Sequence, residues 1–130
     1  MVNLKAKPYY LSDEQVQWVE DTIASMTIEE KIGQLFVNMV TDRDPEELKR
    51  VVQTYHPGAI RYHNTSAEAL YEQNKTLQDA SRIPLLIASN CEAGGNGGVG
   101  GGTPMANGAA VAATGGEEAA YEMARVGAVE

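Results

Sequence analysis

The sequence contains 130 residues, enough for one domain at most, since domains usually hold roughly 100–200 residues. Hydrophobic residues make up 43% and charged residues 22%, which is typical of folded globular chains and argues against overall disorder. The 18 acidic and 10 basic residues give a formal charge of −8, which opposes binding to nucleic acid and to anionic membrane surfaces.

A capping box predicts the first helix. Ser12 followed by Gln15 supplies the hydroxyl and the amide that satisfy free N–H groups at a helix start. The apolar residues that follow recur with helical periodicity on one face: Val16, Val19, Ile23 and Met26. We therefore expect residues 1–25 to form a leading segment and a helix ahead of the main fold.

Two further helices are predicted next along the chain. A second capping box at 27–30 opens a short helix that should direct Ile28 and Ile32 inward. Asp44 then precedes Pro45, whose ring suits the first position of a helix. The helix that follows carries one apolar stripe: Leu48, Val51, Val52 and Tyr55.

Three more helices are predicted in the second half. The longest runs from Thr65 or Ser66 to about Ser81, a short one covers 109–113, and the last begins at Glu117. Periodicity predicts the side chains that the long helix and the last helix bury: Ala67, Leu70, Tyr71, Leu77, Ala120, Met123 and Ala124.

Short apolar runs without polar alternation lie between these helices, at 35–40, 59–62 and 85–88. Such runs, bounded by Gly or Pro, are typical of parallel strands that are buried on both faces. The distance between their centres fits one strand, one crossover helix and two short loops. The sequence therefore predicts an α/β fold.

The number of strands limits what that fold can be. Three strands, or four at most, cannot close an eight-stranded barrel, which takes about 250 residues. The last predicted helix is followed by neither a C-cap glycine nor a helix breaker. We expect the front part of a larger α/β domain, and a small self-sufficient three-layer α/β domain is the alternative.

A glycine-rich segment, SNCEAGGNGGVGGGTP at 89–104, directly follows the third predicted strand. Ligands of parallel sheets bind at the carboxyl ends of the strands. Asn90, Cys91 and Glu92 are therefore the best-placed polar residues of the sequence. Glycine also lets a ligand approach the backbone closely.

A phosphate-binding loop is a weak interpretation of this segment. Gly95, Gly97 and Gly100 satisfy the pattern G-x-G-x-x-G. No helix is predicted directly after them, so no row of free N–H groups would face a pyrophosphate. No lysine stands near Thr103 either, which argues against a P-loop.

Four segments, in order, resemble glycoside hydrolase family 3. PLLIASNCEAGG at 84–95 is similar to the segment in which a barrel strand ends in Asp and Glu-Gly-Gly follows. MTIEEKIGQLF at 26–36 resembles the entry helix and first strand, and HPGAIRYHN at 56–64 resembles the second strand. TPMANGAAVAATG at 103–115 resembles a stretch in which Pro precedes a helix of small residues.

The resemblance implies the N-terminal portion of a (β/α)₈ TIM barrel: a partial barrel of three to four βα units over 26–130. It further implies an exo-acting, retaining β-glycosidase, either a β-N-acetylhexosaminidase or a β-glucosidase, with no cofactor and no metal. In this family the nucleophilic Asp and the proton donor come from later segments. The resemblance thus places both beyond Glu130 and implies that the 130-residue chain alone is inactive.

The resemblance also implies sugar-binding residues. Asn90 stands where the family has an Asp that holds hydroxyls of the terminal sugar, and Glu92, Gly94 and Gly95 match the Glu-Gly-Gly that follows. Asn can donate and accept hydrogen bonds but lacks the charge of Asp. Ala93 is an extra residue within this motif.

Two further candidates come from the residues themselves. Arg61 and Asn64 stand near the carboxyl end of the second predicted strand, where they can line the edge of a pocket. His56 and His63 have no partner that spacing places beside them, so catalysis by either is disfavoured. Cys91 is disfavoured as a nucleophile, because the adjacent Glu92 opposes formation of its thiolate.

The leading hypothesis is an enzyme that acts on carbohydrate. The alternative is a free-standing, non-catalytic α/β module that binds a small polar ligand at 89–103. An incomplete barrel exposes an apolar strand edge, so we also expect self-association. The first ten residues lack a signal peptide and no apolar run approaches the ~20 residues of a membrane helix, so the sequence predicts a cytoplasmic protein.

Overall fold

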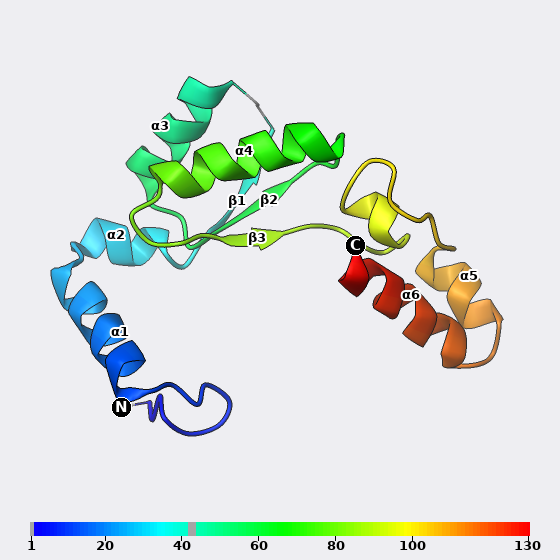
Figure 1. Cartoon of the computed structure of the whole chain (residues 1–130), viewed down its shortest axis with the longest axis horizontal. Helices are drawn as coiled ribbons and strands as arrows, with labels where there is room; N and C mark the ends of the chain where they lie inside the picture. Colours follow the sequence, from blue (N-terminus) through cyan, green and yellow to red (C-terminus); the bar gives the residue numbers. More distant parts are fainter. Residues whose placement is uncertain (1, 42–43) are drawn as a thin grey trace.

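The computed structural model describes residues 2–41 and 44–130. It contains helices and strands in mixed α/β order (Figure 1). In chain order the elements are α1 (Asp13–Ser25), α2 (Ile28–Gly33), β1 (Val37–Val40), α3 (Pro45–Tyr55), β2 (Ala59–Tyr62), α4 (Ala67–Ala80), β3 (Leu86–Ala88), the 3-10 helix η1 (Gly95–Gly97), α5 (Gly108–Ala113) and α6 (Glu118–Val129).

The three strands form one parallel sheet in the order β1-β2-β3. Val37, Ala59 and Leu86 lie side by side in register, and so do Met39, Arg61 and Ala88. Helix α3 connects β1 to β2 and helix α4 connects β2 to β3. The predicted α/β class and the parallel pairing are therefore confirmed.

Two strands begin later than the sequence predicts, because the preceding residues are engaged in other hydrogen bonds. Leu35 and Phe36 donate their N–H groups to Ile32 O and Gly33 O, which prolongs the last turn of α2. The backbone of Leu85 is engaged by the side chain of Gln78, which donates to its carbonyl at 2.8 Å and accepts from its N–H at 3.0 Å.

The predicted caps are present in the structure. Both capping boxes form, at Ser12 with Gln15 and at Thr27 with Glu30. The Ser66 hydroxyl accepts the N–H of Ala69 at the start of α4. These contacts join residues only three positions apart, so the sequence carries all the information that they need.

The hydrophobic core lies between the sheet and helices α3 and α4, which cover the same face of the sheet (Figure 1). Its members are buried: Val40, Leu48, Val52, Ile60, Leu77 and Leu85. Gln73 is buried on the inner face of α4 between Leu70 and Leu77, a position that the sequence analysis did not identify.

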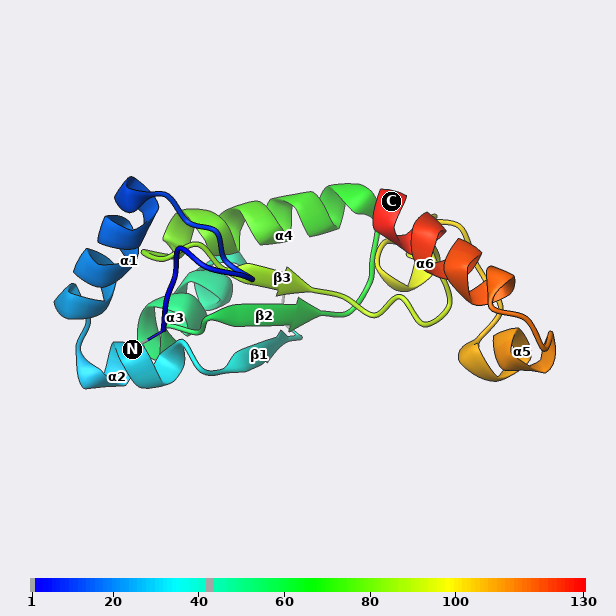
Figure 2. The same cartoon turned by 90° about the horizontal axis from the view of Figure 1, so that it is seen from below.

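The opposite face of the sheet is not covered by α3 or α4 (Figure 2). Val37 is 61% exposed and Leu86 is 74% exposed. The prediction that these strands are buried on both faces is therefore wrong for this face in the described part of the chain. The apolar residues are there, but no neighbouring element packs on them.

Several helical side chains predicted to be buried are exposed instead. Tyr71 is 65% exposed because it follows Leu70 by about 100° around α4 and so turns away from the sheet. Ile28 is 64% exposed and Ile32 is 50% exposed, because α2 packs through its C-terminal end. The remaining exposed members of the predicted set are Ala67, Ala120 and Ala124.

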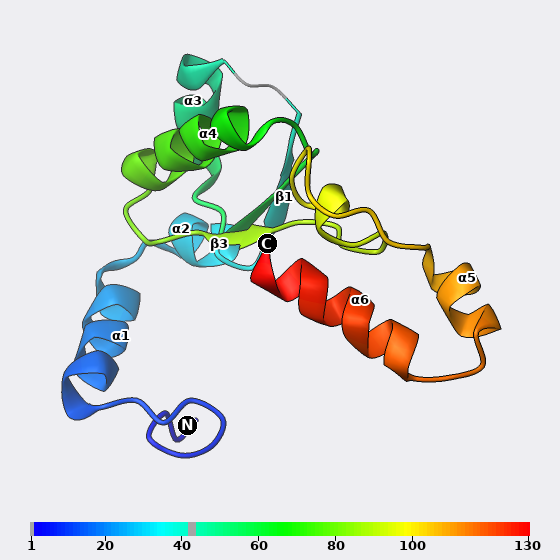
Figure 3. The same cartoon turned by 45° about the vertical axis from the view of Figure 1, so that its right-hand side comes forward.

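Helices α5 and α6 pack on each other beyond the carboxyl end of the sheet (Figure 3). The end of α6 contacts η1, which follows β3. Among residues 2–41 and 44–130, no helix is long and apolar enough to cross a membrane.

Candidate functional site

The carboxyl ends of β2 and β3 bring two polar side chains together. Arg61 lies opposite Ala88 in the parallel register, and Asn90 follows Ala88 by two residues. Arg61 lies in register with the exposed Met39, so its side chain belongs to the face that α3 and α4 leave uncovered, and Asn90 meets it from just beyond the end of β3. Arg61 Nε donates to Asn90 Oδ1 at 3.0 Å, and both residues are half-buried.

The glycine-rich loop docks on the connection between β2 and α4. Asn64 Nδ2 donates to the carbonyl of Asn96 at 2.5 Å. Gly100 N donates to the carbonyl of Thr65 at 2.7 Å. The structure thus brings Arg61 and Asn64, both predicted from the second strand, to the loop that holds Asn90.

Several glycines of this loop pack against other parts of the chain. A Cβ at Gly97 would lie 2.2 Å from the carbonyl oxygen of Asn90, and one at Gly100 would lie 2.7 Å from that of Thr65. Gly94 has φ +83° and, like Gly95, is buried. The loop therefore needs glycine in order to fold on its own backbone, which is a structural reason for its composition.

The other predicted site residues lie apart from this contact. The side chain of Glu92 is exposed and makes no hydrogen bond or ion pair with any residue that the structure describes. The space beside Gly94 is filled by Met105 and the space beside Gly95 by Glu130. Of the predicted site residues, Arg61 and Asn90 contact each other through their side chains.

A contact that the sequence analysis missed closes the loop from the other side. The carboxylate of Glu130 accepts from Thr103 N at 2.8 Å and from Thr103 Oγ1 at 2.5 Å. The Thr103 hydroxyl, and to a smaller extent the Thr103 N–H, lower the pKa of Glu130 below its ordinary value, because they stabilise the charged carboxylate. These residues are 27 positions apart, so no local pattern could have indicated the pair.

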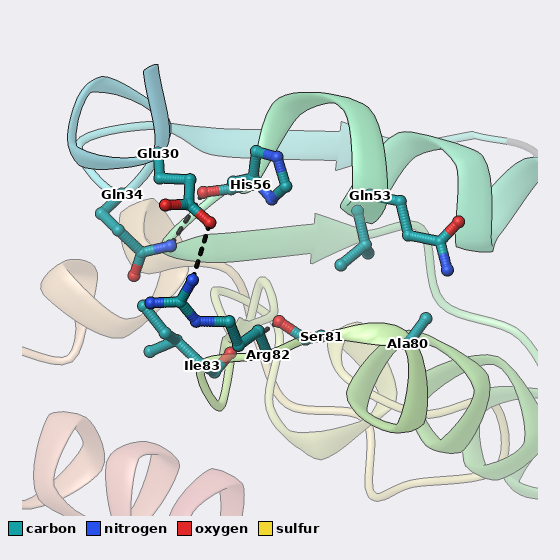
Figure 4. A pocket seen from close by; sticks show the side chains of 9 residues that line it. Glu30, Gln34, Gln53, His56, Ala80, Ser81, Arg82 and Ile83 are labelled. Atoms are coloured by element: carbon teal, nitrogen blue, oxygen red, sulfur yellow. Dashed lines mark hydrogen bonds and ion pairs between the residues drawn. The ribbon is translucent and has the colours of Figure 1, made fainter. Parts of the chain in front are cut away.

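A small cavity of about 30 Å³ lies near the amino ends of the strands (Figure 4). Arg82 Nη1 contacts Glu30 Oε1 at 3.0 Å, and Arg82 Nη2 donates to Ser25 Oγ at 2.7 Å. Gln34 Nε2 donates to the carbonyl of His56 at 2.8 Å. The cavity has room for about one water molecule. The contacts around it are structural, because they join α2 to the end of α3 and to the segment that follows α4.

Neither histidine side chain makes a hydrogen bond or ion pair with a residue that the structure describes. His56 ends α3 in the left-handed conformation, with φ 46°. Cys91 is exposed, with its Sγ 3.5 Å from Ser89 Oγ. Over the described ranges, 2–41 and 44–130, no group of three or more His, Cys, Asp or Glu residues could hold a metal ion.

Comparisons with known proteins give one family. A family model described as the glycosyl hydrolase family 3 N terminal domain matches residues 27–130. A curated protein of Cellulomonas fimi, beta-N-acetylglucosaminidase/beta-glucosidase, is 36% identical over 115 residues, which are 88% of this chain and 20% of that protein.

Two solved structures of the beta-glucoside phosphorylase BglX are also similar. The structure bound to 2FGlc has a TM-score of 0.79 and 42% identity, over 95% of this chain and 22% of that one. The other has a TM-score of 0.77 and 40% identity, over 95% of this chain and 21% of that one. The chain therefore spans about a fifth of the length of these relatives.

Proposed function

Because this chain belongs to glycosyl hydrolase family 3, we propose that it serves in the removal of terminal β-linked sugars, as part of a β-N-acetylhexosaminidase or β-glucosidase. The reaction proceeds with retention of configuration at the anomeric carbon. Retaining hydrolysis needs a nucleophilic carboxylate and a proton donor ~5 Å apart. In this proposal, residues 1–130 supply part of the sugar-binding shell, and both catalytic groups lie outside them.

The architecture supports a partial (β/α)₈ barrel as the framework of this site. Residues 26–130 would form its first βα units, after a leading segment and helix at 1–25. The parallel order β1-β2-β3, with α3 and α4 on one face, is the arrangement of consecutive barrel units. The uncovered face would then line the barrel interior, which explains the exposed Val37 and Leu86.

The observation that carries the functional proposal is the contact of Arg61 with Asn90 at the carboxyl ends of β2 and β3. Barrel enzymes build their active sites at this end of the strands. Asn64, Glu92, Gly94 and Gly95 complete the proposed sugar-binding set. Asn90 would hold the sugar, with Arg61 beside it, and the loop glycines would shape the backbone around it.

The test compares the 130-residue chain with the natural gene product that carries it. Release of p-nitrophenol from p-nitrophenyl β-D-glucoside and β-N-acetylglucosaminide is measured for both. We expect turnover by the gene product and none by the 130-residue chain. Failure of the gene product on both substrates would refute the function, and steady turnover by the short chain would refute the location of the catalytic pair.

A second candidate, phosphorolysis, is favoured by the two BglX structures, which are named as beta-glucoside phosphorylases. In that reaction inorganic phosphate replaces water as the acceptor of the glycosyl group. The same assay with and without phosphate separates the two functions, since phosphorolysis yields a sugar 1-phosphate. The alternative, a non-catalytic module that binds a small polar ligand at 89–103, predicts neither product.

A further inference from the structure

We propose that Arg61 is a positioning residue that fixes the Asn90 carboxamide with its NH₂ group, not its oxygen, toward the sugar. The inference rests on the proposed function, since it needs a sugar at Asn90. It makes Asn90 a hydrogen-bond donor to a sugar oxygen. It also distinguishes this site from one in which a carboxylate at the same position accepts from a sugar hydroxyl.

The orientation follows from the chemistry of the two groups. A guanidinium carries only donors, so the carboxamide atom that faces Arg61 Nε at 3.0 Å must be the oxygen. With Oδ1 turned to Arg61, the Nδ2 group on the other branch of the carboxamide points away from Arg61.

Both partners are held from their backbones. Arg61 lies within β2, with Met39 and Ala88 beside it in register. The carbonyl of Asn90 faces Gly97 so closely that a Cβ there would lie 2.2 Å away. The backbone positions from which the two side chains meet are therefore fixed.

Arg61 itself adds further donors beside Asn90. Within the described chain, Nη1 and Nη2 of Arg61 make no hydrogen bond or ion pair. The corner formed by Arg61 and Asn90 thus offers N–H groups to a ligand, and it suits a ligand oxygen with free lone pairs. A sugar hydroxyl can fill that role, because its oxygen accepts while its proton bonds elsewhere.

Fluorinated sugars test the direction of this hydrogen bond. A C–F group accepts weakly and cannot donate, whereas a C–H group at the same position does neither. The probes are methyl β-D-glucopyranoside and its 3-, 4- and 6-monodeoxy and monodeoxyfluoro analogues, titrated calorimetrically into the natural gene product. At the ring position that Asn90 contacts, we expect the fluoro analogue to bind ~3- to 10-fold tighter than the deoxy analogue.

Substitutions at Arg61 decide whether it sets this preference. Arg61→Met leaves the carboxamide free to turn, so the preference should fall to about one. Arg61→Lys should restore it, because an ammonium group also only donates. Arg50→Met, at an exposed arginine of α3 paired with Glu47, is the matched control and should leave the preference unchanged.

The outcomes separate the two proposals. If the gene product binds none of the probes, the proposed sugar-binding function fails. If it binds them without a fluoro preference, or if Arg61→Met weakens both analogues equally and keeps the preference, the positioning role fails alone. Should Arg61→Met not fold, Asn90→Asp decides: a carboxylate there accepts, so retention of the wild-type preference overturns the inference.

Discussion

Gly97 shows how single residues of the glycine-rich loop shape the site. Its Cα faces the carbonyl oxygen of Asn90, where an added Cβ would lie only 2.2 Å away. Both atoms belong to the backbone, so neither can rotate aside as the end of a side chain could. The position of Asn90 thus depends on the absence of a side chain at residue 97.

Replacing Gly97 by alanine should therefore displace Asn90 and destabilise the fold. We expect Gly97→Ala to lower the free energy of unfolding by about 1–3 kcal/mol, the usual cost of overpacking. Chemical denaturation measures this change. Gly108→Ala is the matched control, because the space there is open, and it should be neutral or slightly stabilising. Equal effects of the two substitutions would contradict this account of the loop.

Glu130 links pH to the order of the same loop. Its pKa is lowered by the hydroxyl and the N–H of Thr103, so the folded chain holds the carboxylate charged to lower pH than the unfolded chain does. The contact therefore contributes full stability above the unfolded pKa, and this contribution is lost as the pH falls through the folded pKa.

An NMR titration of the Thr103 amide tests this linkage. We expect its chemical shift to change with a midpoint below that of glutamate in an unstructured peptide. In Glu130→Gln the acid-induced change should disappear, because the amide oxygen accepts at every pH. A midpoint at or above the peptide value would show that the carboxylate is not stabilised by Thr103.

At the scale of elements, α2 is held against the turn between α3 and β2 by two glycines. A Cβ at Gly33 would lie 2.2 Å from Tyr55 O, and one at Gly58 would lie 2.1 Å from Gln34 O. Gln34 Nε2 completes the joint with a hydrogen bond to His56 O at 2.8 Å. The two backbones approach each other closely, which fixes where β2 starts.

Alanine at this joint should cost more than at an open glycine. We expect Gly58→Ala to lower the free energy of unfolding by about 2–3 kcal/mol, since the clash is with backbone atoms on a packed element. Gly116→Ala, where no atom lies within 4 Å, is the control and should change stability little. Guanidinium titrations followed by circular dichroism measure both. A tolerated Gly58→Ala would mean that the joint adjusts.

The same elements show what a sequence can and cannot predict. Capping boxes at Ser12 and Thr27 were predicted because each depends on residues three apart. Arg61 and Asn90 were each predicted to lie at the carboxyl end of a strand, but the hydrogen bond between them was not predicted, because it depends on how the two strands pair. The exposure of Ile28 was not, since it depends on which elements pack nearby. The pair of Thr103 with Glu130 depends on the path of α5 and α6, which no local pattern encodes.

At the scale of the whole molecule, the face of the sheet that α3 and α4 leave uncovered has no packing partner within the described residues. Val37, Met39 and Leu86 are exposed on it, and β1 and β3 have open edges within the described sheet. Exposed apolar surface and unpaired strand edges both favour association. In the proposed barrel this face would be covered by further strands, and in the isolated 130-residue chain it would face solvent.

We therefore expect the isolated 130-residue chain to associate through this face. Sedimentation velocity should show an average mass that rises with protein concentration. Leu86→Lys should shift the chain toward the monomer without unfolding it, because the side chain is already exposed and the added charges repel each other across the interface. Ile28→Lys is the matched control, as Ile28 is similarly exposed but lies on α2 outside the sheet. Monomeric wild-type chain at high concentration, or equal effects of both lysines, would show that the uncovered face does not drive association.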